Sequence, residues 1–189
     1  MSSKVNPDER NRHQLNSGSP TETYRCDGCE TVYQVAGAEQ PTVLCPDCKQ
    51  VATPHSDLMA KREYQIGYAK YLEARRQATA AMRRFESRDL ALARGRFNDA
   101  ATDFEASVCH FTAAMKEATS HSVADSCDLA RKKATCLWQA VEWLGGATYA
   151  SEQGDESRAA RYRSDAEQQL AVASECGDLL NSDELQVTD

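Results

Sequence analysis

Cys26-Asp27-Gly28-Cys29, followed after fifteen residues by Cys45-Pro46-Asp47-Cys48, decides the fold of the N-terminal part of this 189-residue chain. Two Cys-x-x-Cys pairs at this spacing can close a tetrahedral metal site, usually for Zn²⁺. We therefore predict one metal ion, with zinc favoured over iron, bound by Cys26, Cys29, Cys45 and Cys48. Four protein ligands leave no open coordination position, which disfavours metal-catalysed hydrolysis at this site.

The residues around the cysteine pairs predict a small β ribbon over residues 23–54. Residues 31–35 alternate as in a short strand, and residues 42–44 form a second strand that leads into the second pair. Gly28 and Pro46 suit the tight turns inside the pairs. About thirty residues bury too little apolar surface to fold alone, so we expect metal binding to supply the folding free energy.

This arrangement resembles zinc ribbons and the Cys-x-x-Cys…Cys-Pro-x-Cys knuckles of rubredoxin-like modules. The resemblance implies a four-cysteine metal site and does not imply a particular biological role. Rubredoxin-like knuckles usually place glycine directly after the second cysteine of each pair, whereas this chain has Glu30 and Lys49 there. That departure disfavours a redox-active iron centre and makes structural zinc the preferred prediction.

The charge of the chain is unevenly distributed around a net value of −7. Residues 61–96 carry ten basic and four acidic side chains, while residues 97–189 carry seven basic and seventeen acidic ones. Overall acidity argues against a general nucleic-acid binder, but the local excess of +6 allows a local contact. The candidate residues for a contact with nucleic acid or an acidic partner are Arg75, Arg76, Arg83, Arg84, Arg94 and Arg96. The competing interpretation is a solvated helix face that pairs with the acidic second half.

We expect a cytoplasmic protein that does not cross a membrane. No apolar run approaches the ~18 residues of a membrane span, and the N-terminus lacks the apolar segment of a signal peptide. Reduced thiols are then the rule, so the helical cysteines should pack as small apolar side chains: Cys109, Cys127, Cys136 and Cys176. The polar residues 1–22 are predicted to be disordered, and residues 181–189 form an acidic tail.

All five prolines lie at or before Pro54, which predicts a helical domain over residues 55–180. We expect helices over about 56–94, 97–119, 122–152 and 156–176, with a candidate break in the first at 87–89. Gly95-Arg96 is expected to form a turn, and Ser56 and Ser122 are expected to act as N-caps. Gly145-Gly146 predicts close approach of a neighbouring helix.

Two segments of this helical region share a pattern of glycine, small residues and an aromatic residue. They are Gly95-x-Phe97-x-x-Ala100-Ala101-x-x-Phe104 and, 59 residues later, Gly154-x-x-x-x-Ala159-Ala160-x-Tyr162. The pattern resembles tetratricopeptide repeats, which implies helical hairpins, but it departs from their regular length and lacks their closing proline. An ordinary four-helix bundle with alanine-rich interfaces is an equal alternative.

The predicted fold is therefore mostly α, with a small N-terminal β zinc ribbon followed by a four-helix, tetratricopeptide-like helical-hairpin domain. A metal knuckle beside four helices also resembles rubrerythrins, but their Glu-x-x-His iron ligands are absent from the sequence. We recognise no catalytic constellation and predict a non-enzymatic zinc-binding adaptor or scaffold that mediates protein–protein interaction. The alternatives are a nucleic-acid-associated factor that uses the ribbon and the arginine-rich helix, and rubredoxin-like electron transfer.

Overall fold

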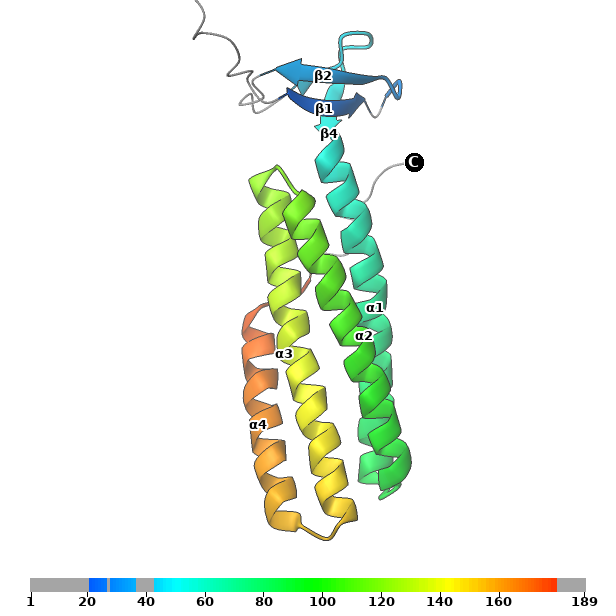
Figure 1. The fold of residues 1–189 in the computed structure, drawn as a ribbon, viewed down its shortest axis with the longest axis vertical. Coiled ribbons are helices and arrows are strands. Elements are labelled where there is room, and N and C mark those ends of the chain that lie inside the picture. The colour runs from blue at the N-terminus through cyan, green and yellow to red at the C-terminus, as the bar shows by residue number, and fades with distance from the viewer. Residues whose placement is uncertain (1–20, 27, 37–42, 180–189) are drawn as a thin grey trace, which may run out of the picture. The chain divides into compact units, whose positions relative to one another are not determined.

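The computed structural model describes residues 21–26, 28–36 and 43–179. The predicted tails, apart from Thr21 and Glu22, lie outside these ranges. The chain divides into two compact units, Met1–His55 and Ser56–Asp189, which are described separately below. The first unit contains a small antiparallel sheet and the second contains four helices (Figure 1), which confirms the predicted mostly α fold with a small N-terminal β unit before four helices.

The sheet contains four short strands in the order β2-β1-β4-β3. They are β1 (Thr21–Cys26), β2 (Val32–Ala36), β3 (Val43–Leu44) and β4 (Val51–Pro54), and every neighbouring pair is antiparallel. The sequence predicted strands at the positions of β2 and β3 but missed the mostly polar β1 and the four-residue β4. Thr21 and Glu22 therefore belong to a strand and not to the predicted tail.

The described apolar core of this unit is very small, because only Tyr24, Val43 and Ala52 are buried in it. Tyr33 and Val35 from β2 are partly buried against these residues, and the Tyr24 and Tyr33 rings stack at 6.2 Å between centroids. Such a core cannot by itself balance the conformational entropy of folding. The unit therefore depends on a further source of stability.

The second unit consists of α1 (His55–Glu86), α2 (Leu90–Glu117), α3 (His121–Glu152) and α4 (Glu156–Glu175). The first turn lies at residues 87–89, where Arg88 takes a left-handed backbone conformation with φ of 63°. The predicted turn at Gly95-Arg96 is wrong, since α2 runs straight through it. Nothing lies within 4 Å of a Cβ built on Gly95, so neither packing nor backbone geometry requires glycine there.

The predicted N-caps are also wrong in position. Ser56 and Ser122 lie inside α1 and α3, and the residue that caps α3 is Ser120. Of the two glycines that define the repeat-like pattern, only Gly154 lies in a turn, with φ of 76°. The two segments therefore do not occupy equivalent structural positions.

Aromatic side chains interlock α1 with α2, which run antiparallel. Tyr64 meets Phe111 with ring centroids 5.1 Å apart, and Tyr71 meets Phe104 edge-on at 5.8 Å. Between these pairs lies Gly67, where a Cβ would stand 3.0 Å from ring atoms of Phe111. Glycine is thus required at this point for the two helices to approach so closely.

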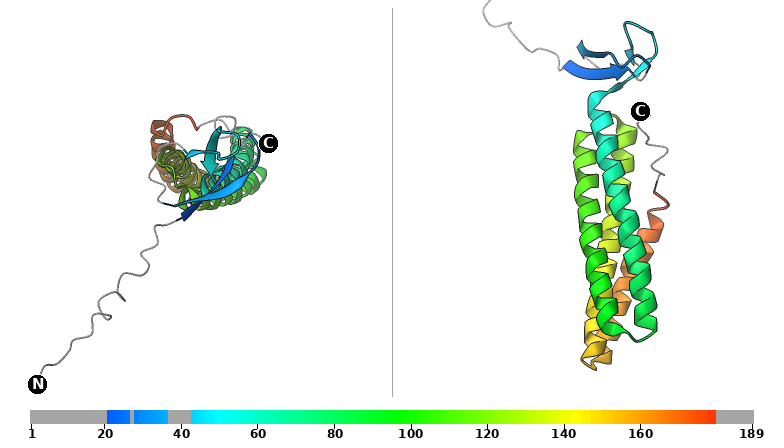
Figure 2. Two further views of the ribbon diagram at one scale, coloured as in Figure 1. Left: turned by 90° about the horizontal axis from the view of Figure 1, so that it is seen from above. Right: turned by 90° about the vertical axis from the view of Figure 1, so that its right-hand side faces the viewer.

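Small residues join α3 to α4, which lies on the outer side of α3 away from α2 (Figure 2). The buried residues of α4 are alanines at a spacing of seven: Ala159, Ala166 and Ala173. Gly146 of α3 faces Tyr162, and a Cβ on this glycine would lie 3.2 Å from the tyrosine ring. The close helix approach predicted from Gly145-Gly146 is therefore confirmed.

A buried carboxylate at the start of α1 holds the turn between α2 and α3. Asp57 is only 3% exposed, and its Oδ1 accepts hydrogen bonds from the backbone N–H groups of Thr119 (2.8 Å) and Ser120 (3.0 Å). Backbone N–H groups before a helix have no intrahelical partner, so Asp57 supplies the acceptor for two of them at the entry to α3, where the Ser120 side chain makes no capping hydrogen bond.

We predict that Asp57→Ala lowers the free energy of unfolding of the helical unit by roughly 1–3 kcal/mol, because two partly buried backbone N–H groups lose their acceptor. Urea unfolding monitored by tryptophan fluorescence measures this change, since both tryptophans lie in α3. The matched control Asp125→Ala removes an exposed carboxylate and should change stability by less than about 0.5 kcal/mol. Equal effects of the two variants would contradict this role for Asp57.

Candidate metal centre

The four predicted cysteines converge in the first unit. Their sulfur atoms all lie within 4.8 Å of one another, with Cys26 Sγ 3.3 Å from Cys48 Sγ and Cys29 Sγ 3.5 Å from Cys45 Sγ. A regular tetrahedron of sulfurs around one metal, with bonds of about 2.3 Å, has edges of about 3.8 Å. The sulfur separations bracket this value, so the four cysteines could hold one metal ion.

The two cysteine pairs adopt the same backbone fold. In the first, Cys26 N donates to Thr31 O (3.0 Å) and Glu30 N donates to Cys26 O (2.9 Å). In the second, Cys45 N donates to Gln50 O (2.8 Å) and Lys49 N donates to Cys45 O (3.1 Å). The strands deliver the first cysteine of each pair, since β1 ends at Cys26 and β3 ends just before Cys45. The candidate metal centre is thus assembled from two equivalent knuckles.

The residues that replace glycine keep the knuckle geometry. Glu30 and Lys49 both take the left-handed conformation, with φ of 59° and 63°. This conformation is uncommon for residues with a side chain. Lys49 Nζ also donates to Pro46 O at 2.7 Å, a bond that glycine could not make. Because Glu30 and Lys49 adopt the conformation that favours glycine, this departure no longer discriminates zinc from iron.

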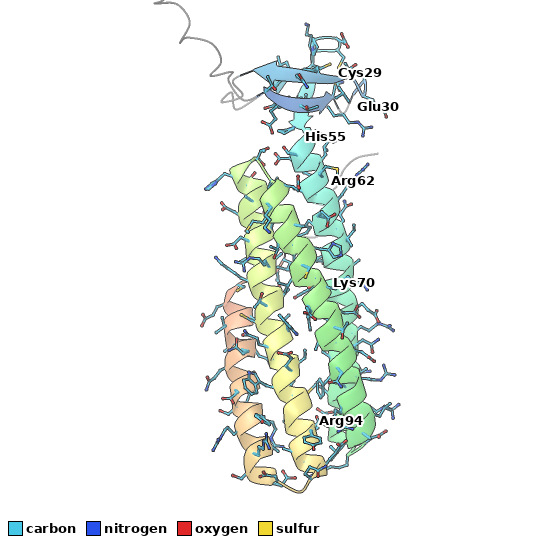
Figure 3. All side chains as sticks on the ribbon, in the orientation of Figure 1. Cys29, Glu30, His55, Arg62, Lys70 and Arg94 are labelled. Atoms are coloured by element: carbon cyan, nitrogen blue, oxygen red, sulfur yellow. The ribbon has the colours of Figure 1, made fainter. Side chains whose placement is uncertain are left out.

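One cysteine of each pair is buried and one is exposed. Cys26 and Cys45 are fully buried, while Cys29 and Cys48 face solvent, and Figure 3 shows Cys29 beside Glu30 at the edge of this unit. Hydrogen bonds from the Thr31 side chain and backbone lower the pKa of Cys29 to about 6. Thiolates are the metal-binding form of cysteine, and a lowered pKa favours that form.

The pKa of Cys48 is shifted in the opposite direction to that of Cys29. A backbone hydrogen bond from Gln50 favours its thiolate, but the neighbouring sulfur of Cys26 and desolvation outweigh it and raise the pKa of Cys48 to about 12. Crowded sulfurs resist carrying several negative charges at once, and a cation among them removes that penalty. His55, the first residue of α1, is not part of the cluster.

The predicted arginine cluster is divided among three places. Four of its members line one open pocket of about 400 Å³: Arg76, Arg83, Arg84 and Arg96. Arg75 lies over the Tyr71 ring at 5.8 Å. Arg94 lies near the start of α2 (Figure 3) and forms an ion pair with Glu152 at 2.9 Å. The sequence predicted one arginine-rich helix. This prediction is wrong for Arg94 and Arg96, which belong to α2 and not to α1.

Within the pocket, most of the arginines already have partners. Arg76 makes two bonds to Glu73 (2.6 and 2.9 Å), and Arg96 donates to Gln77 Oε1 at 2.8 Å. Arg84 lies 3.7 Å from Asp89. In the described part of the chain, only Arg83 of these four has a side chain without a hydrogen-bond or ion-pair partner. The alternative interpretation, a solvated helix face with paired charges, therefore holds for much of this surface.

An apolar groove of about 430 Å³, which the sequence analysis missed, lies between α1 and α4 above a floor formed by α3. Its apolar lining residues are Ala78, Met82, Phe85, Phe104, Leu137, Val141, Leu144, Ala166 and Leu170. Met82 is 36% exposed and Leu170 is 42% exposed. The apolar residues in the second half of α1 therefore line an open surface.

Comparison with known proteins found no matching family model, no similar curated protein and no similar solved structure. Among the described helices, none combines the length and apolar character that crossing a membrane requires. The candidate functional features of the chain are the cysteine cluster, the arginine pocket and the apolar groove.

We predict that Cys26→Ser or Cys45→Ser reduces bound metal from about one ion per chain to near zero, because each removes a buried ligand of a four-ligand site. Elemental analysis of purified protein measures this loss. Cys109→Ser, an exposed helical cysteine, is the control and should retain the metal. The helical unit should keep its tryptophan fluorescence and unfolding midpoint in all three variants; loss of metal from the control would argue against this cluster as the site.

Proposed function

We propose that this protein is a non-enzymatic, zinc-binding adaptor that binds a partner protein through its helical unit. The observation that carries the proposal is the open apolar groove between α1 and α4. The floor of the groove is well packed: Val141 is 4% exposed, and Leu137 and Leu144 pack against the main core. Concave apolar surfaces of this kind are typical of ligand and partner sites.

Zinc is the metal we propose for the cysteine cluster. Four thiolates in a closed tetrahedral arrangement are the usual ligands of structural zinc. The small core of the ribbon supports a structural role, because the unit needs the free energy of metal binding to fold. Such a site leaves no coordination position for a substrate, which favours an adaptor over an enzyme.

Rubredoxin-like electron transfer is the alternative at the same site, since the knuckle geometry would also accept iron. Anaerobically purified protein should be colourless and contain zinc. A red protein with iron bound by the four cysteines would support electron transfer and contradict the structural role.

We predict that Leu170→Asp lowers partner capture at least about tenfold, because a buried, unpaired carboxylate would oppose an apolar partner in the groove. Leu92→Asp is the matched control, since Leu92 is equally exposed (42%) but does not line the groove. Quantitative affinity purification from the native cell compares the two variants with wild-type protein. Equal losses in both variants, or no loss in either, would contradict binding in the groove.

The arginine pocket favours a second candidate, contact with nucleic acid, since the Arg83 side chain has no partner among the described residues and three further guanidinium groups lie beside it. Phosphate contacts release counterions and make binding steeply salt-dependent. Under the adaptor proposal, nuclease treatment and the double variant Arg83→Glu/Arg84→Glu should leave partner capture within about twofold of wild type. Loss of capture in both experiments would favour the nucleic-acid function instead.

A further inference from the structure

We infer that the partner segment in the groove is an amphipathic α-helix with acidic residues along its polar edges. This inference rests on the adaptor function proposed above and adds the conformation and charge of the bound segment. Three features of the groove support it: the spacing of the apolar lining residues, the hydrogen-bonding capacity of the walls and the charges at the rim.

The apolar lining residues form stripes along the groove. On α1 they are Ala78, Met82 and Phe85, and on α3 they are Leu137, Val141 and Leu144. Both stripes have steps of four and three residues, so each covers about two helical turns, or roughly 10 Å. A guest helix with its own stripe at this spacing would present apolar side chains to α1 and α3 over the same length.

The walls determine the conformation of the guest. Each wall is a helix whose backbone N–H and C=O groups are already bonded within the helix. An extended peptide in this groove would find no backbone partners, and its own N–H and C=O groups would be buried unsatisfied. A helix satisfies its own backbone, so it is the conformation that an apolar, helix-walled groove accepts.

The rim determines the charge of the guest. Arg75 on α1 and Arg163 on α4 line opposite walls, together with the single carboxylate of Glu167. In the described part of the chain Arg75 has no carboxylate partner, and Arg163 lies 3.8 Å from Glu156 in a loose ion pair. A guest helix with acidic side chains on both edges would therefore place one edge near Arg75 and the other near Arg163.

Partly exposed ion pairs of this kind are individually weak. Each is expected to increase affinity by at most about fivefold, and added salt should reduce the gain. The apolar stripe should then supply most of the affinity, and the rim should discriminate among guests of equal apolar content. This division of roles can be tested with peptides that differ only in charge.

The test uses three fluorescein-labelled peptides with one shared leucine stripe at helical spacing and with glutamate, glutamine or lysine at every polar position. These three residues have similar helix propensities, so the comparison isolates charge. Fluorescence anisotropy with the full chain should show binding in the order glutamate, glutamine, lysine. The glutamate peptide should exceed the lysine peptide by about tenfold at low salt, and this ratio should shrink at about 0.5 M salt.

Variants then locate the effect. Arg75→Glu/Arg163→Glu should reverse the order of the peptides, whereas Arg76→Glu/Arg83→Glu, which changes two arginines outside the groove, should preserve it. Leu170→Asp should weaken binding of all three peptides. Circular dichroism of each variant checks that the helices are intact.

Three results would overturn the inference. One is equal affinity for the three peptides, or an unchanged order in Arg75→Glu/Arg163→Glu. Another is the absence of measurable binding by any peptide. A third is a dimer of the wild-type chain that Leu170→Asp dissociates, since the occupant would then be a second copy. In the first two cases, partner capture that still depends on Leu170 would leave the adaptor function standing. Partner capture that does not depend on Leu170 would contradict both the adaptor function and the helical, acidic guest.

Discussion

The close approach of helices at small residues is the constraint on which the helical unit depends. At Gly67 the absence of a side chain brings α1 against Phe111, and the aromatic pairs on either side can then interlock. At Gly146 the same feature brings α3 against the Tyr162 ring of α4. These contacts fix α1 and α4 on their neighbours without bringing them together, so the groove between α1 and α4 follows from the packing that stabilises the unit.

The ribbon depends on a different source of stability. Its described core contains one buried aromatic residue and two small apolar ones, whereas its four sulfurs already lie at metal-binding separations. The two units therefore differ in what can stabilise them: a metal ion held by the cysteine cluster would stabilise the first, whereas side-chain packing stabilises the second. Loss of such a metal would affect the first unit and leave the apolar groove of the second intact.

The sequence predicted those features that depend on local spacing. The metal ligands follow from two Cys-x-x-Cys pairs, and four helices follow from the periodic apolar residues after Pro54. Predictions that placed turns at glycine residues failed where other residues adopt the left-handed conformation. Arg88 adopts a left-handed conformation in the turn between α1 and α2, while Gly95 lies inside α2. Glu30 and Lys49 likewise adopt a conformation that favours glycine.

The groove and the arginine pocket could not be predicted in the same way, because both are formed by residues far apart in the chain. Arg96 joins Arg76 only because the turn at residues 87–89 folds α2 back along α1. Met82 and Leu170 continue the apolar stripes of their helices, and nothing local distinguishes them from core residues. Their exposure depends on the separation of α1 from α4, which only the packed structure defines.

The alanine stripe of α4 has a consequence for local unfolding. A buried alanine methyl contributes much less transfer free energy than the buried phenylalanines that hold α2, since each buried carbon adds only about 0.8 kcal/mol. We therefore expect α4 to be the first helix to detach, with amide hydrogens that exchange faster than those of the other three. One wall of the groove is then an element of low local stability, and an occupant would slow exchange most strongly along α4.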